Sequence, residues 1–255
     1  MTKPQPVIKL SDIENSLGGF PNTGRYIFRG LSSKYNCIKP SLYYKRNHSS
    51  TKAREIETYL INSFIRILKD DYDIQSMQVN AYSLDTWLIA RHFSLSSRFV
   101  EFSRDFSVGL QFSFEYAKES NTNAYLWALK SDSNTEIKQL DSNSIDSINP
   151  FEIDEYFFVN PRLLLAKENQ TKLAYDRMFN QHSIFLLQPM KWASTPVTEK
   201  TNNSSWKLFE IRQEHFFNIS KEVEIKYDIS MTKNLLMKDH PLDKKCKELN
   251  KIENV

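Results

Sequence analysis

Residues 26–31 read Tyr26-Ile27-Phe28-Arg29-Gly30-Leu31. This run is typical of a β-strand, yet it carries one arginine among apolar residues, followed by one of only five glycines in the chain. Because burying an unpaired charge is costly, the pattern predicts that Arg29 meets an anion. A guanidinium binds two oxygens at once, so a protein carboxylate and a ligand phosphate both remain open as its partner. Gly30 removes a side chain where another group needs to approach the backbone closely.

Composition favours a globular protein of one large domain or two small ones. The chain has 255 residues, of which 40% are hydrophobic and 13% aromatic, enough for a sizeable core. Its formal net charge of +3 permits contact with nucleic acid without requiring it. Cys37 and Cys246 lie far apart and make no metal-ligand spacing, which indicates a reducing compartment. We find no signal peptide and no apolar run near the roughly 20 residues of a membrane span. We therefore expect a cytoplasmic protein with no membrane partner.

Apolar spacing predicts three main helices and a set of short strands. The helices are expected at residues 52–69, 83–92 and 105–118, and a shorter one at 231–238. The strands are expected at residues 26–31, 124–129, 183–188, 206–211 and 222–229, with 98–102 either a strand or a connector and 131–149 a loop. Since helices and strands do not alternate strictly, the sequence predicts an α+β domain. We divide the chain into a lead-in at 1–22, a domain at 23–240 with an insertion about 193–205, and a frayed basic tail at 241–255.

Several separated motifs resemble one family pattern. They are Phe28-Arg29-Gly30; Lys39-Pro40-Ser41-Leu42; residues 88–93 joined to 97–102; residues 108–112; and Arg177 with Gln181, His182, Ser183 and Phe185. Their order and spacing resemble the FRG-domain family, named for its Phe-Arg-Gly motif, from about Phe28 to Gln188. The chain departs from the family pattern in the central motif. Arg91 stands where the family usually has glutamine, and Glu101 stands in for aspartate.

The resemblance implies a fold and an activity. The family is associated with bacterial defence and toxin–antitoxin loci. It is also associated with an ADP-ribosyltransferase-like fold, a split mixed or antiparallel sheet flanked by helices in a single domain. ADP-ribosyl transfer uses NAD, whose diphosphate needs cationic anchors and whose ribose needs a nearby carboxylate. Under this hypothesis two sets of residues form the site. They are Arg29, Gly30, Arg98 and Arg177 for binding NAD, and Glu101, His92 and Gln181 for catalysis.

Each assignment has a structural alternative. His92 shares a helical face with Leu88, so a core histidine with satisfied hydrogen bonds remains open. Arg98 and Glu101 point to opposite faces of a regular strand, so they join one site only if the backbone turns there. Arg177 and Gln181 share a face if their segment is helical, where they would brace a loop.

The function predicted from the sequence is an intracellular, toxin-type ADP-ribosyltransferase that modifies nucleic acid, with RNA favoured over DNA. Such an activity needs restraint, so an antitoxin protein is expected as a partner, together with a chaperone in some systems. The basic tail and the 193–205 insertion are candidate docking segments. Two alternatives stay open: a non-catalytic module that binds phosphate, nucleic acid or protein, and a nuclease. We find no set of Asp, Glu and His at metal-binding spacing and expect no metal.

Overall fold

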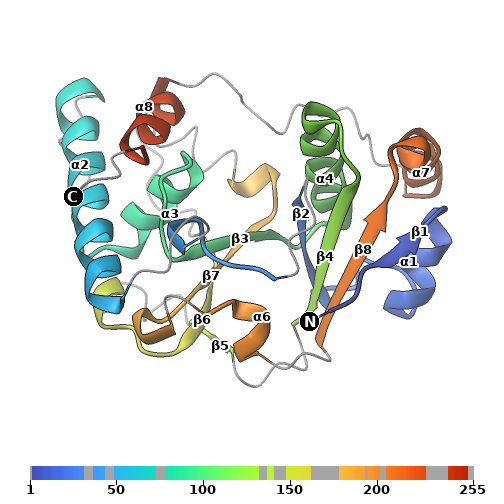
Figure 1. Ribbon diagram of the computed structural model, residues 1–255, viewed down its shortest axis with the longest axis horizontal. Helices are drawn as coiled ribbons and strands as arrows, with labels where there is room; N and C mark the ends of the chain where they lie inside the picture. The colour runs from blue at the N-terminus through green and yellow to red at the C-terminus, as the bar shows by residue number, and fades with distance from the viewer. Residues whose placement is uncertain are drawn as a thin grey trace.

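A computed structural model describes residues 2–31, 37–43, 49–72, 79–131, 137–140, 148–161, 178–192, 195–201, 205–227 and 241–251. It is a single α+β domain built on one mixed sheet, as expected from the sequence (Figure 1). Within the described residues the sheet has eight strands in the order β1-β8-β4-β2-β3-β7-β6-β5. No helix in these ranges combines the length and apolar character that a membrane span requires.

The strands form two groups of four. One group holds β1 (Gln5–Val7), β8 (Trp206–Ile211), β4 (Ala124–Lys130) and β2 (Tyr26–Leu31). The other holds β3 (Phe99–Ser103), β7 (Ser183–Leu187), β6 (Tyr156–Val159) and β5 (Ile137–Gln139). Neighbours pair antiparallel except β1 with β8 and β5 with β6, which pair parallel. The sheet is therefore mostly antiparallel, as the sequence predicts.

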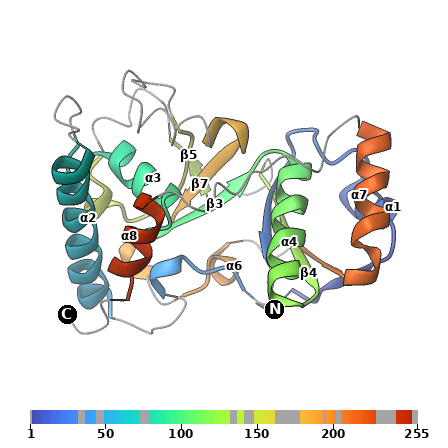
Figure 2. The same cartoon turned by 90° about the horizontal axis from the view of Figure 1, so that it is seen from above.

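Different helices cover the two groups (Figure 2). The first group is covered by α1 (Leu10–Leu17), α4 (Phe106–Ser120) and α7 (Gln213–Tyr227), whose apolar faces form one core cluster with β2, β4 and β8. The second is covered by α2 (Ser50–Tyr72), α3 (Leu84–His92) and α8 (Pro241–Leu249), which form another cluster with β3 and β7. A third cluster on the other side of the sheet includes Ile27, Trp127 and Val197, the last from α6 (Val197–Lys200).

The two groups of strands meet at a single point. β2 pairs with β4 along its whole length from Tyr26 to Leu31, and β3 pairs with β7 from Phe99 to Ser103. Between β2 and β3, however, the only pairing in the described sheet is Phe28 with Ser103. In Figure 1, β3 runs nearly crosswise to β2 and β4. The strands therefore diverge from this contact and leave room between them.

Two glycines bring α4 against β2. A Cβ atom on Gly30 would lie 2.3 Å from the backbone nitrogen of Ser113 and 2.4 Å from the carbonyl oxygen of Gly109. A Cβ on Gly109 would lie 2.6 Å from the Cβ of Phe28. All three separations are too short for real atoms, so only glycine at these two positions permits this helix–strand distance. The close approach expected at Gly30 is confirmed, and the group that approaches is the backbone of α4.

The helices expected at residues 52–69, 83–92 and 105–118 are confirmed. α4 begins at Phe106 because the Asp105 side chain caps its N-terminus, accepting hydrogen bonds from the backbone N–H groups of Ser107 and Val108. Ser83 precedes α3 but makes no side-chain capping bond.

Two expectations about secondary structure are wrong. Residues 222–227 belong to α7 and not to a strand, because Phe216, Ile219 and Val223 place their side chains in the core at helical spacing. The loop expected at 131–149 contains β5. In the lead-in assigned to residues 1–22, the structure has β1 and α1. The helix expected at 231–238 lies outside the described residues.

The C-terminal tail is also more ordered than expected through residue 251. α8 buries Leu242 and Cys246 against the cluster of α2 and α3. Just after α8, the Asn250 side chain donates to the carbonyl of Ser94 and accepts from the N–H of Ser96, both at 2.8 Å. The tail thus holds the connection between α3 and β3, and fraying is excluded for this part of it.

Replacing Gly30 with alanine should destabilise the fold by about 1–3 kcal/mol, because the new methyl group forces α4 away from β2. Urea unfolding followed by circular dichroism measures the change. Gly24→Asn is a suitable control, since Gly24 has an open surrounding and a left-handed backbone that asparagine tolerates. Equal stability of Gly30→Ala and the wild type would show that this packing does not constrain the fold.

Candidate functional site

A cavity of about 280 Å³ opens where β2 and β3 diverge. It is bordered by both strands, by α4, by the end of α3 and by the segment that leads into β7. The lining residues are Phe28, Arg29, Gly30, Leu31, Arg91, Glu101, Phe102, Ser103, Gly109, Phe112, Tyr116, Gln181 and Ser183. Four of the seven residues assigned to the site from the sequence are therefore in this lining: Arg29, Gly30, Glu101 and Gln181.

Arg29 is half-buried on β2 and reaches across to β3. Its Nη1 donates a hydrogen bond of 2.5 Å to the backbone carbonyl oxygen of Glu101. Its Nε is buried and has no hydrogen-bond partner among the described residues. No described carboxylate forms an ion pair with it, so the structural arginine–carboxylate pair left open by the sequence is not observed in the described ranges. Arg29 thus brings a positive charge to the cavity wall.

Glu101 lies at the centre of β3 with 24% of its side chain exposed. Its Oε1 accepts a hydrogen bond of 2.9 Å from the Ser183 hydroxyl, and His92 Nδ1 lies 3.3 Å from the same oxygen. Both contacts hold one oxygen of the carboxylate. Among the described residues none forms a hydrogen bond or ion pair with Oε2, which leaves that oxygen for a ligand in the cavity.

The electrostatics of the cavity favour the charged form of Glu101. Burial by itself would raise the pKa of this carboxyl, but the hydrogen bond and charge of His92, the charge of Arg91 and the hydrogen bond of Ser183 outweigh it. Together they lower the pKa of Glu101 from its usual 4.5 to about 2. The carboxylate is therefore ionised at neutral pH. It can stabilise a positive charge or accept a proton, but it cannot donate one.

His92 lies behind Glu101 and does not line the cavity. It ends α3, only 2% of its side chain is exposed, and its Nε2 is buried with no hydrogen-bond partner. His92 is thus buried as a core histidine would be, but the described residues do not satisfy its Nε2, and its Nδ1 contacts the cavity residue Glu101. His92 can act on a ligand only through Glu101.

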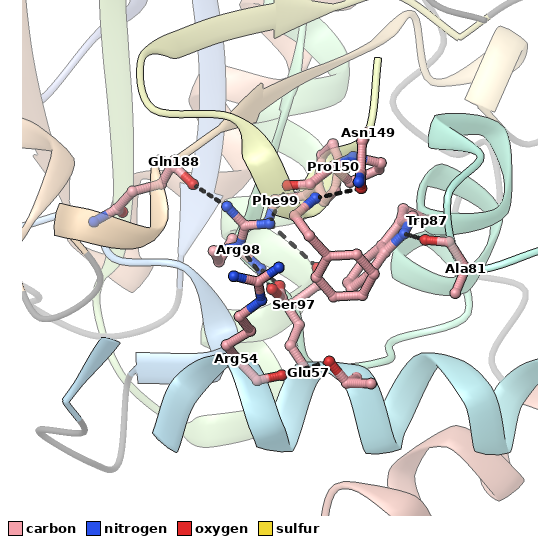
Figure 3. A network of polar contacts seen from close by, with 12 residues as sticks. Arg54, Glu57, Ala81, Trp87, Ser97, Arg98, Phe99, Asn149, Pro150 and Gln188 are labelled. Atoms are coloured by element: carbon pink, nitrogen blue, oxygen red, sulfur yellow. Dashed lines mark hydrogen bonds and ion pairs between the residues drawn. The ribbon is translucent and has the colours of Figure 1, made fainter. Parts of the chain in front are cut away.

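Arg98 lies outside the cavity, in a network that Figure 3 shows from close by. Its Nε donates to Glu57 at 2.6 Å, and its Nη1 and Nη2 donate to the backbone carbonyls of Gln188 and Pro150. Neither side chain of the Arg98–Glu57 pair is exposed. All three nitrogens are used within the protein, so Arg98 joins α2, β3 and the segments around Pro150 and Gln188 in the core, and a role in binding NAD stays a prediction. Arg177 lies outside the described residues.

Among the lining residues that have no role in the site expected from the sequence, four bear on the chemistry of the cavity: Arg91, Phe112, Tyr116 and Ser183. Arg91 was noted only as a departure from the family pattern, although it is adjacent to His92, and its Nη1 donates to the Ser41 hydroxyl at 2.8 Å. Phe112 and Tyr116 lie on the helix expected at residues 105–118, and their rings stack at 6.1 Å on the cavity side of α4. Their i, i+4 spacing predicts that the two rings lie side by side on one face of the helix. Ser183 was noticed in the family motif but given no role.

Burial raises the pKa of the Tyr116 hydroxyl. Tyr116 is therefore neutral at physiological pH and serves as a hydrogen-bonding group. Among the described residues there is no cluster of three or more His, Cys, Asp or Glu side chains that could hold a metal ion.

Comparison with known proteins identifies part of the chain. Residues 24–122 match the family model of the FRG domain. No curated protein and no solved structure gives a significant match. The matched segment contains β2, α2, α3, β3 and α4, and hence Arg29, Arg91, Glu101 and Tyr116. Gln181 and Ser183, which complete the cavity, lie beyond it.

Removing one member of the buried Arg98–Glu57 pair should be strongly destabilising. Glu57→Ala leaves the guanidinium buried without its counter-ion, at an expected cost of about 3–5 kcal/mol. The double variant Glu57→Leu, Arg98→Met removes both charges, so its free energy of unfolding should fall by less than that of Glu57→Ala. Urea unfolding of both variants checks this prediction, which is wrong if the double variant is the less stable of the two.

Glu101 should also make stability depend on pH in the acid range. Because the folded state lowers its pKa, its contribution is complete above about pH 4.5 and is lost as the pH falls towards 2. The lowering corresponds to about 3 kcal/mol at most. The stability difference between wild type and Glu101→Gln should therefore shrink between pH 5 and pH 2. In contrast, Glu55→Gln, which changes an exposed residue on α2, should show a small, nearly constant difference.

Proposed function

We propose, starting from the match of residues 24–122 to the FRG domain family model, that the protein is an ADP-ribosyltransferase that uses NAD as its substrate. One observation supports this most directly. An ionised carboxylate, Glu101, and the guanidinium of Arg29 line the same cavity at the split of the sheet, and Arg29 has no described carboxylate to neutralise it. The implied resemblance to ADP-ribosyltransferase-like folds agrees with a site at this position.

The charges suit the two ends of the reaction. In this transfer the ribose–nicotinamide C–N bond of NAD breaks, neutral nicotinamide leaves with the electron pair, and an acceptor oxygen or nitrogen bonds to the ribose and loses its proton. A carboxylate held charged near the ribose stabilises the positive charge that develops there. Glu101 fills this role best, because no described residue forms a hydrogen bond or ion pair with its Oε2. Its ionised state also allows it to take the acceptor's proton.

Arg29 and Arg91 suit the diphosphate. A buried guanidinium nitrogen without a partner is costly, and the unpaired Nε of Arg29 would gain a partner from a phosphate oxygen. Arg91 adds a second positive charge from α3 to the same lining. The cavity volume of about 280 Å³ lies just below the roughly 300–1,000 Å³ of small-molecule pockets. It therefore holds one half of the dinucleotide, with the other half extending past its mouth.

His92 and Ser183 act as positioning residues in this proposal. Both contact Oε1 of Glu101, which fixes the carboxylate and keeps it ionised. Holding a catalytic group in place before the reaction lowers the barrier, because the group need not reorganise. Gln181, buried in the wall next to Ser183, is placed to hydrogen-bond a ribose hydroxyl or the acceptor.

For the acceptor we propose nucleic acid, with RNA favoured over DNA, inside a bacterial defence or toxin–antitoxin system in the cytoplasm. The net charge of +3 favours attraction to phosphates. A neutralising antitoxin, with or without a chaperone, follows from the need to restrain such an activity. The packed helix α8 makes the tail a less open docking segment than the sequence suggested, since Leu242 and Cys246 are already buried.

Label transfer tests the proposal. The purified protein is incubated with NAD labelled in the adenylate and with RNA, DNA or bacterial lysate, and nicotinamide release is measured in parallel. Arg29→Ala and Glu101→Gln should each reduce transfer about 100-fold or more, because each removes a charge that acts in the transition state. Arg212→Ala is the matched control, since Arg212 is 71% exposed between β8 and α7.

Each other outcome points to a rival function. If neither labelled product nor nicotinamide appears with any acceptor, while NAD or phosphate binds in an Arg29-dependent way, the chain is a non-catalytic binding module. Shortened nucleic acid that depends on a divalent metal indicates a nuclease. Transfer that persists in both Arg29→Ala and Glu101→Gln would contradict the assignment of this cavity.

A further inference from the structure

An exposed aromatic surface lies beside the cavity, where the end of β3 meets the start of β7. Phe179 is 62% exposed, and its ring stacks on that of His182 with 6.5 Å between centroids and 24° between planes. Arg104, also exposed, follows β3 directly, and its Nη2 donates to the side chain of Asn160 at 2.8 Å. We call Phe179, His182 and Arg104 the β3–β7 surface.

Backbone contacts fix this surface relative to the cavity. The N–H of Arg104 donates to the carbonyl of His182 at 2.9 Å, and the hydroxyl of Ser103 donates to the carbonyl of Gln181 at 2.7 Å. Gln181 lies between Phe179 and His182 in sequence, yet its side chain is buried in the cavity wall. One short turn therefore presents an aromatic ring outside the cavity and an amide inside it.

The chemistry of the β3–β7 surface suits a nucleotide. Stacked aromatic rings offer a flat face to an unpaired base, and an adjacent arginine attracts the phosphate next to that base. The nearest acidic residue in sequence, Asp105, is engaged in capping α4 through the N–H groups of Ser107 and Val108. Its carboxylate is therefore tied to the helix and offsets the charge of Arg104 only in part.

We propose that the β3–β7 surface binds one unpaired base of a single-stranded nucleic acid and its neighbouring phosphate, so that the adjoining nucleotide lies at the mouth of the cavity. This inference deepens the proposed function and rests on it for the identity of the acceptor. A base inside a duplex is stacked on its neighbours and unavailable to Phe179, so the surface discriminates single strands from duplexes.

Another exposed phenylalanine supplies the matched control. Phe217 on α7 is 66% exposed, close to the value for Phe179, but it belongs to the helix that covers the first group of strands (Figure 2). It has its own nearby cation, Lys221, 4.4 Å from the centre of its ring. The two residues therefore differ in their position relative to the cavity and not in their general character.

Fluorescence anisotropy tests the inference without NAD. The probes are a fluorescein-labelled 12-nucleotide RNA, the DNA of the same sequence, and the duplex of each, and every protein variant is titrated at the same series of salt concentrations. Phe179→Ala should raise the Kd for the single strands about 5- to 100-fold, because it removes one stacking contact. Arg104→Gln should raise it less and flatten its salt dependence. Phe217→Ala and Arg212→Gln should change it less than twofold.

The outcomes separate this inference from the proposed function. If Phe179→Ala and Phe217→Ala bind alike, or if duplexes bind as tightly as single strands, the inference is overturned. The inference is also overturned if neither single strand binds while label from NAD is transferred to a protein in the lysate. If the expected binding pattern is found but the wild type releases no nicotinamide from NAD, the surface stands as a nucleic-acid site and the transferase proposal fails.

Discussion

The short contact between β2 and β3 governs the geometry of the cavity. β2 is fully paired on its other edge with β4, and β3 with β7, so neither strand can shift without breaking a ladder. Beyond the Phe28–Ser103 pair the backbone groups on the facing edges need other partners, because buried carbonyls are rarely left unpaired. Arg29 supplies one by donating to the carbonyl of Glu101. The same side chain thus bridges the split and leaves its charge facing the cavity.

Two arginines in apolar surroundings have opposite roles, and the difference lies in their partners. Arg98 has Glu57 as counter-ion and backbone carbonyls for its remaining nitrogens, so its charge is neutralised inside the core. Arg29 is bound to a carbonyl oxygen, which carries no net charge, and keeps one buried nitrogen unpaired. A buried arginine alone therefore says little about function. An arginine beside a cavity, with no counter-ion among the described residues, is stronger evidence for a site that binds an anionic ligand.

The cavity is assembled from more of the chain than the family match covers. Residues 24–122 provide Arg29, Arg91, Glu101 and the aromatic side chains of α4. β7 and the turn before it add Ser183 and Gln181, which orient the carboxylate and complete the wall. Gly30 and Gly109 set the third side by allowing α4 to approach β2. The matched domain and the later strands thus depend on each other for the shape of one site.

Short-range patterns were enough to predict the strand with Arg29 and Gly30, the helices α2, α3 and α4, and the α+β class. Helical and strand periodicity is visible within a few turns of chain, which is why these predictions were confirmed. The folded molecule was needed to show that Arg98 meets Glu57, 41 positions away, and that Ser183 and His92 share one oxygen of Glu101. It also decided that 222–227 is helical, because a run with mixed periodicity follows the core it packs against. Contacts between distant residues depend on how strands pair and diverge, and no local pattern records that geometry.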